Sequence, residues 1–139
     1  MENLLQVYKN DYAQAFFDKQ KGIFFWCWQP ATWDMSDEEY KSTVLAGRDV
    51  FVGLPVKFFV VDSRKMQYAI TPDFQVWYLG LITPIAIEKN IKKVAVLMSE
   101  ELIIQLVSQL IEMDSKEARL PFMIKNFSQE DEALHWLVN

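Results

Sequence analysis

The hexapeptide Ile23–Trp28, IFFWCW, is apolar at every position. Successive side chains of a strand point to opposite faces of a sheet, so this run has apolar side chains on both faces. Such a strand is typical of the centre of a sheet that is covered on both sides. Two further mostly apolar runs, at residues 56–61 and 94–98, predict more strands later in the chain.

Two strands are predicted ahead of the hexapeptide, at Leu4–Tyr8 and Tyr12–Phe17. The polar connection Asp18–Gly22 separates the second of them from Ile23. A glycine that closes a polar connection between two aromatic runs indicates a hairpin. The chain is therefore expected to begin with strands joined by short turns, and a last strand is expected to begin at Phe122.

The first helix is predicted from a capping signal. Ser36 and Glu39 have the spacing of a capping box, in which each side chain bonds to the backbone N–H of the other residue. A helix is therefore expected to begin at about Asp37 and to run towards Phe51.

The strongest helical periodicity of the sequence follows Thr71. Thr71 is a favoured N-cap, Pro72 suits the first helical position, and Asp73 complements the helix dipole in the first turn. The apolar stripe of this helix comprises Phe74, Trp77, Tyr78, Leu81, Ile82 and Ile85. Pro84 is expected to bend or break the helix near Gly80 to Thr83, because its ring collides with the carbonyl four residues earlier.

Two more helices are predicted nearer the C-terminus. Ser99 is expected to cap a helix whose inner side carries Leu102, Ile103, Leu106, Val107, Leu110 and Ile111. Ser128, with Asp131 three residues later, is expected to cap a terminal helix that carries Ala133, Leu134 and Leu137.

The predicted order of elements is β-β-β-α-β-α-β-α-β-α, within a single domain over residues 1–139. Strands that alternate with helices indicate an α/β fold. The expected architecture is an open, mostly parallel β-sheet with helices packed on it and right-handed crossovers.

Composition and charge limit the classes of function. The chain has 14 Lys and Arg residues against 19 Asp and Glu residues, a net charge of −5 that repels a phosphate backbone. Nucleic acid is therefore not expected as a partner. No apolar stretch reaches the roughly 18 residues of a transmembrane helix, and no signal peptide is visible, so a cytoplasmic location is expected.

Residues that carry chemistry are few. Cys27 is the single cysteine, lies within the apolar hexapeptide, and is expected to be buried and unreactive. His135 is the only histidine and has no second His, Cys cluster or spaced carboxylates beside it, so a metal site is not expected. The glycine-rich phosphate loops and the nucleophile elbow of hydrolases are absent from the sequence. No cofactor and no catalytic residue is therefore predicted.

Three stretches resemble the SpoIIAA-like group of bacterial proteins, which adopt the STAS fold of anti-sigma-factor antagonists and sulfate-transporter tails. They are Val56–Asp62 (VKFFVVD), Ile91–Val96 (IKKVAV) and the ending Phe127–Leu137, in which Glu-Ala-Leu-x-Trp-Leu is the most specific part. The resemblance covers the chain from about Leu4 to Val138. It implies an open β-sheet with helices on its faces, and a non-enzymatic regulatory protein that binds a partner and is switched by a kinase.

In the best-understood relatives the switch is a serine in the turn that opens the second helix. That turn corresponds to Thr71–Phe74 in this sequence, and the resemblance places Asp73 at the position of the serine. The phosphoswitch is therefore not carried over. The fold and the resemblance together predict a partner-binding surface at this junction and its neighbouring loops, formed by Thr71, Asp73, Gln75, Asp62 and Arg64.

Four of these five residues also have a purely structural interpretation. Thr71, Pro72 and Asp73 are the residue types that a helix start favours, whether or not a partner binds there. Arg64 follows a strand end, where open α/β sheets bind ligands, and it either holds an anion or pairs with Asp62.

A second hypothesis is a carrier or sensor of a small apolar or lipid-like ligand. The aromatic content of 14% suggests it, and Trp28, Trp33, Phe74 and Trp77 are the candidates to line a pocket at the end of the sheet. Trp33 alternatively folds back as a hydrophobic staple near Tyr40. A homodimer is also considered, formed through an aromatic-rich surface and a bent second helix.

Overall fold

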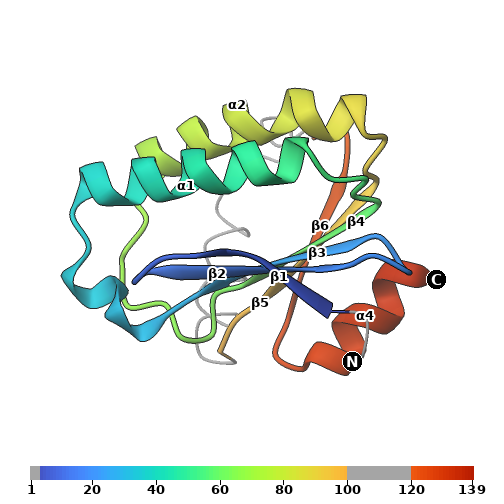
Figure 1. The fold of residues 1–139 in the computed structure, drawn as a ribbon, viewed down its shortest axis with the longest axis horizontal. Coiled ribbons are helices and arrows are strands. Elements are labelled where there is room, and N and C mark those ends of the chain that lie inside the picture. Colours follow the sequence, from blue (N-terminus) through green and yellow to red (C-terminus); the bar gives the residue numbers. More distant parts are fainter. Residues whose placement is uncertain (1–3, 100–119) are drawn as a thin grey trace, which may run out of the picture.

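Six strands form one sheet in the computed structural model, which describes residues 4–99 and 120–139 (Figure 1). They are β1 (Leu4–Lys9), β2 (Ala13–Asp18), β3 (Ile23–Trp28), β4 (Phe58–Asp62), β5 (Lys93–Leu97) and β6 (Met123–Phe127). Their order across the sheet is their order along the chain. β1, β2 and β3 pair antiparallel, whereas β3, β4, β5 and β6 pair parallel. The sheet is therefore mixed and mostly parallel, as an α/β fold requires.

The β2–β3 turn fixes the position of the central strand β3. The Asp18 side chain accepts a hydrogen bond from the backbone N–H of Gln20 at 3.0 Å. Gly22 closes the turn at φ 73°, a conformation that glycine adopts without steric cost. The Gly22 carbonyl accepts bonds from the N–H groups of Lys57 and Phe58 at 2.8 and 3.0 Å, so the turn also holds the start of β4.

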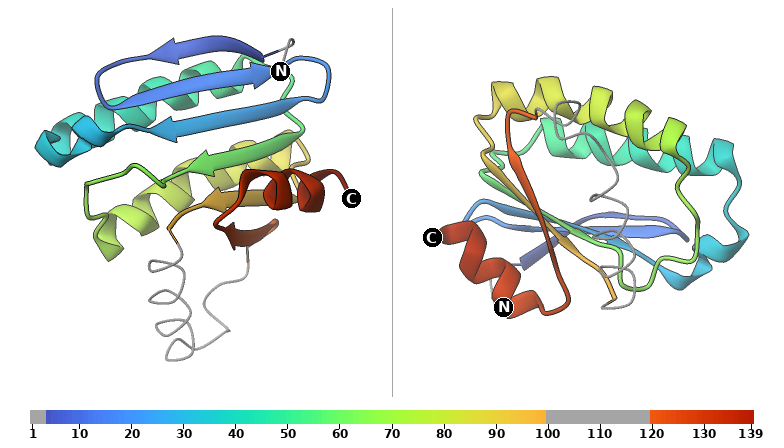
Figure 2. Two further views of the ribbon diagram at one scale, coloured as in Figure 1. Left: turned by 90° about the horizontal axis from the view of Figure 1, so that it is seen from below. Right: turned by 180° about the vertical axis from the view of Figure 1, so that it is seen from behind.

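Among the described residues, two long helices cover one face of the sheet and a short helix lies on the other (Figures 1 and 2). α1 (Asp37–Val52) and α2 (Pro72–Glu88) lie side by side on the first face, and α4 (Glu130–Val138) lies on the opposite face. A short 3-10 helix, η1 (Pro30–Asp34), leads from β3 into α1. The predicted capping box is confirmed, because the Glu39 N–H donates to Ser36 Oγ at 3.1 Å and the Glu39 carboxylate accepts from the Ser36 N–H at 3.0 Å.

We call the side of the sheet under α1 and α2 the aromatic face. Large rings from β3 and β4 fill it: Phe24, Trp26, Trp28 and Phe59. The Phe24 ring meets Phe51 of α1 edge-on, with 5.1 Å between ring centroids. At Gly47, α1 passes so close to Trp26 that a Cβ atom would lie 2.5 Å from the indole ring. This helix–sheet contact therefore requires glycine.

We call the opposite side the α4 face. Its buried core combines small and medium-sized side chains with two phenylalanine rings: Ile23, Phe25, Val60, Ala95, Leu97, Phe127, Ala133 and Leu137. α4 packs mainly on β5 and less on β6 and β4. The Lys93 side chain of β5 donates to the carbonyl of Trp136 in the last turn of α4 at 2.9 Å. The short helix is thus fixed to the sheet at its C-terminal end.

Two helix ends differ from the predictions. Phe127 still belongs to the sheet, where its carbonyl accepts from the Met98 N–H at 3.0 Å, so α4 begins later than expected. Its N-cap is Gln129, which makes no side-chain capping bond, and the predicted cap at Ser128 is wrong. α2 continues through Pro84 to Glu88, so the helix does not break there, and the alternative of a bend stays a prediction. The helix predicted after Ser99 lies outside the described residues, and the full predicted order stays a prediction.

Candidate functional site

The start of α2 is an exposed helix end built from Thr71, Pro72 and Asp73. Thr71 has an extended backbone, and its Oγ1 accepts a hydrogen bond from the Phe74 N–H at 3.3 Å. Pro72 occupies the first helical position, and Asp73 lies in the first turn, where a carboxylate complements the helix dipole. The predicted helix start is therefore confirmed. All three side chains, and that of Gln75, are exposed and accessible to a partner.

Beneath this helix start lies a stack of rings centred on Tyr40 of α1. Tyr40 stacks on Trp28, Tyr68 and Phe74 at centroid distances of 5.7, 5.1 and 5.5 Å, with ring planes within 18° of parallel. The Lys41 ammonium lies 5.0 Å from the centroid of the Phe74 ring, an arrangement that favours a cation–π contact. These contacts fix the start of α2 to α1 and to the sheet.

The phenols of this stack are held in their neutral form. The Tyr68 hydroxyl donates to the carboxylate of Asp37 at the start of α1. Burial and, second, this hydrogen bond raise the pKa of Tyr68. Burial raises the pKa of Tyr40 to about 12. Neither phenol has the pKa near neutrality that a general acid or base needs.

The side of α2 that points away from the sheet is apolar and exposed. We call it the outer α2 surface, and it comprises Val76, Gly80, Pro84 and Ile87, which are all exposed and recur at helical spacing. Val76 is 72% exposed and Ile87 is 62% exposed. The buried residues of α2, Ile82 and Ala86, lie on the other side of the helix. No charged residue occurs between Asp73 and Glu88, so this helix is apolar on both its inner and its outer side.

The centre of the outer α2 surface has an unusual backbone. Apart from its chain neighbours and the backbone of its own helix, a Cβ atom added at Gly80 would meet no atom within 4 Å, so the surface is open there. Pro84 has no N–H, and it cannot give the helical hydrogen bond to the Gly80 carbonyl. Next to it, the Thr83 hydroxyl donates to the Leu79 carbonyl at 2.6 Å. The middle of the surface therefore combines a position without a side chain and a carbonyl that lacks its usual helical donor.

Sequence reasoning did not identify the outer α2 surface. It selected the residues at the strongest helical spacing, which form the inner stripe of α2. The signal that could have identified the surface was the uncharged run from Phe74 to Ile87, in which Val76 and Ile87 lie off that stripe. A helix that is apolar all round has more apolar surface than one sheet can cover.

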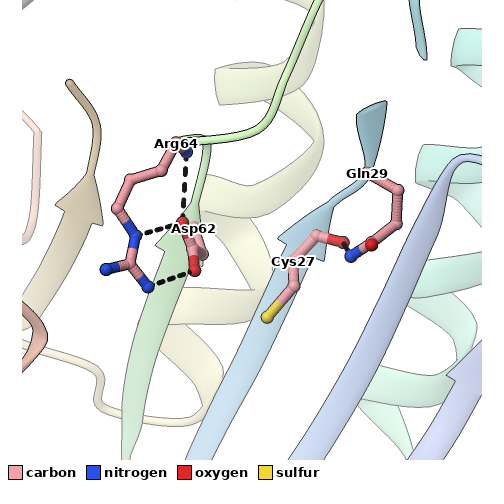
Figure 3. A network of polar contacts seen from close by, with 4 residues as sticks. All are labelled: Cys27, Gln29, Asp62 and Arg64. Atoms are coloured by element: carbon pink, nitrogen blue, oxygen red, sulfur yellow. Dashed lines mark hydrogen bonds and ion pairs between the residues drawn. The ribbon is translucent and has the colours of Figure 1, made fainter. Parts of the chain in front are cut away.

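Asp62 and Arg64 pair with each other at the C-terminal end of β4 (Figure 3). Arg64 Nε donates to Asp62 Oδ1 at 3.0 Å, and Arg64 Nη2 donates to Oδ2 at 2.8 Å. Of the two predicted alternatives, the structure therefore shows the ion pair, in which Asp62 engages both Nε and Nη2 of Arg64. Within the described ranges, no hydrogen bond joins this pair to Thr71, Asp73 or Gln75.

Cys27 lies on β3 directly beside Asp62 of the neighbouring strand β4 (Figure 3). The side-chain amide of Gln29 donates to the Cys27 carbonyl at 3.0 Å. Burial and, second, the carboxylate of Asp62 raise the pKa of the Cys27 thiol to about 12. Such a thiol is protonated at neutral pH and a poor nucleophile, as predicted, although Cys27 is partly rather than fully buried.

Three of the four aromatic residues proposed for a ligand pocket meet around Tyr40, and the fourth lies apart. Trp28, Phe74 and Trp77 all contact the Tyr40 ring, which fills the space between them. Trp33 in η1 is 73% exposed, so the prediction that it packs back near Tyr40 is wrong. Trp28 occupies that position instead, because it comes from the end of β3 and stacks on Tyr40 from the sheet side.

A small apolar cavity of about 30 Å³ lies between α1, α2 and the sheet. Its lining includes Trp26, Gly47, Arg48, Phe51 and Tyr78. This volume holds roughly a water molecule or two, and ordinary ligand pockets are roughly ten times larger. None of the four aromatic residues proposed for the ligand pocket lines it.

Metal and membrane sites can be assessed over residues 4–99 and 120–139. In those ranges no group of three or more His, Cys, Asp and Glu side chains is placed to hold a metal ion. None of the helices described there is long and apolar enough to span a bilayer.

The stretches that resemble the SpoIIAA-like group form β4, β5 and the region from β6 to α4. In the last of them, the ring centroids of Phe127 and Trp136 lie 5.6 Å apart, so this part of the resemblance is a packing contact between α4 and the sheet. Comparison of the chain with models of protein families, with curated proteins and with solved structures found no match. Membership in the group therefore stays a prediction.

Proposed function

We propose that the protein is a STAS-like regulatory domain without catalytic activity, which binds a protein partner through the outer α2 surface and the exposed start of α2. The observation that carries this proposal is α2 itself. A helix that is apolar all round is ordinarily buried on all sides, yet Val76 and Ile87 of this helix are exposed. Contiguous exposed apolar surface on a folded domain marks an interaction site.

The chemistry of the described residues supports binding rather than catalysis. The Cys27 thiol has a pKa raised to about 12, and the Asp62 carboxylate is engaged by Arg64. Burial also keeps the phenols of Tyr40 and Tyr68 neutral. Apolar and aromatic side chains, by contrast, are what the buried centres of protein interfaces contain.

The start of α2 supports recognition without a phosphate switch. The Thr71 hydroxyl is engaged as the N-cap of the helix. Asp73 brings a fixed negative charge to the position that the resemblance assigns to the switch serine, and it is exposed. In this proposal the partner meets a constitutive carboxylate and an apolar helix face next to it.

A pull-down with matched surface variants tests the proposal. The bait is the full chain as wild type, as Val76→Glu on α2, and as Val52→Glu on α1, where Val52 is 51% exposed. We expect proteins from an extract of the producing cells to be recovered with the wild type and Val52→Glu and to be lost with Val76→Glu. Equal recovery with all three baits would contradict the proposed surface.

Two further measurements complete this test. The double variant Thr71→Ala, Asp73→Ala examines the start of α2, and it is expected to reduce recovery without abolishing it. Thermal unfolding of each bait guards against misfolding, because exposed substitutions ordinarily change stability by less than about 0.5 kcal/mol.

The alternative of an apolar-ligand carrier receives less support from the geometry. The space among Trp28, Phe74 and Trp77 is occupied by the Tyr40 ring. The cavity between α1, α2 and the sheet measures about 30 Å³, far less than a lipid chain needs. Native mass spectrometry of freshly purified protein decides this alternative, since a carrier retains a bound small molecule.

A further inference from the structure

We draw no further inference here: the strongest candidate, the edge strand β6 with the exposed apolar side chains of Met123 and Ile124, carries none, because nothing in the described part of the chain shows what covers this edge.

Discussion

The two faces of the sheet pack against their helices with different kinds of side chain. On the aromatic face, α1 and α2 rest on large rings, and α1 lies close to Trp26 at Gly47. On the α4 face, a helix of nine residues lies close to β5, with Ala95 and Ala133 both fully buried. Large rings make contact with a helix that lies farther from the strands, whereas small residues let a short helix lie close to the strands. The consequence is that the two faces should respond to different perturbations.

The tyrosines sharpen this contrast. All five tyrosines of the chain pack on the aromatic face: Tyr8, Tyr12, Tyr40, Tyr68 and Tyr78. The α4 core contains none among its members. The pKa of each of the five phenols is raised. Burial is the largest cause for four of them, and for Tyr12 the largest cause is the hydrogen bond to Glu39. Only the aromatic face therefore depends on phenols that must stay neutral.

Alkaline pH is expected to have the largest effect, because all five phenols act in the same direction. A raised pKa means that the folded chain keeps protons that the unfolded chain releases, so the contribution to stability is complete below pH 10. It is lost as the pH rises from 10 towards the value of about 12 that Tyr12 and Tyr40 reach. Absorbance of tyrosinate and circular dichroism, followed together, check this.

In that titration we expect tyrosinate to appear well above pH 10 and in step with the loss of ring ellipticity. Free titration of all five phenols near pH 10 with an intact fold would contradict the buried ring stack.

A substitution at Gly47 is expected to have the next largest effect. In Gly47→Ala the new Cβ would meet two Trp26 ring carbons at 2.5 and 2.6 Å. Overpacking of this kind costs about 1–3 kcal/mol. Trp26→Phe removes the outer part of the indole, so the double variant should lose less stability than the two single variants added together. Urea denaturation of all four proteins gives the coupling energy, and strict additivity would show that the ring moves away freely.

The smallest expected effect concerns the α4 face. Lys93→Met removes the bond from Nζ to the Trp136 carbonyl at 2.9 Å and the ammonium that lies 5.2 Å from the Trp136 ring centroid. The expected loss is about 0.5–1.5 kcal/mol of unfolding free energy. Lys92→Met is the matched control, because Lys92 is the exposed neighbour. Equal stability of both variants would mean that Lys93 does not hold α4.

Local signals in the sequence predicted much of the fold. The bounds of β3 agree with the prediction. A strand with apolar side chains on both faces is typical of the centre of a sheet that is covered on both sides. The starts of α1 and α2 were predicted from capping residues, whose bonds span three positions of the chain. Strand ends were less accurate, as at β4, because ladder partners rather than side-chain type decide where pairing begins.

The candidate site was predictable only in its local part. Thr71 and Asp73 could be placed at a helix start, since capping is a local interaction. Whether a given apolar side chain is covered depends on which elements lie above it, and the uncharged run of α2 indicates only that part of its apolar surface stays exposed, not which residues are covered. The alternative that Trp33 packs near Tyr40 was therefore wrong, and the exposed residues Val76 and Ile87 were not predicted as part of the site.

The sequential order of the strands also has a consequence for how the chain folds. Each ladder joins strands that follow one another in sequence, so no strand must wait for a distant part of the chain. The antiparallel contacts of β1, β2 and β3 are local, so they cost little loop-closure entropy and favour rapid folding, whereas the parallel ladders join residues as far apart as Ile23 and Phe58 and are expected to form more slowly. During synthesis the hairpins of β1, β2 and β3 can form first, and each later strand adds to an existing edge as it leaves the ribosome.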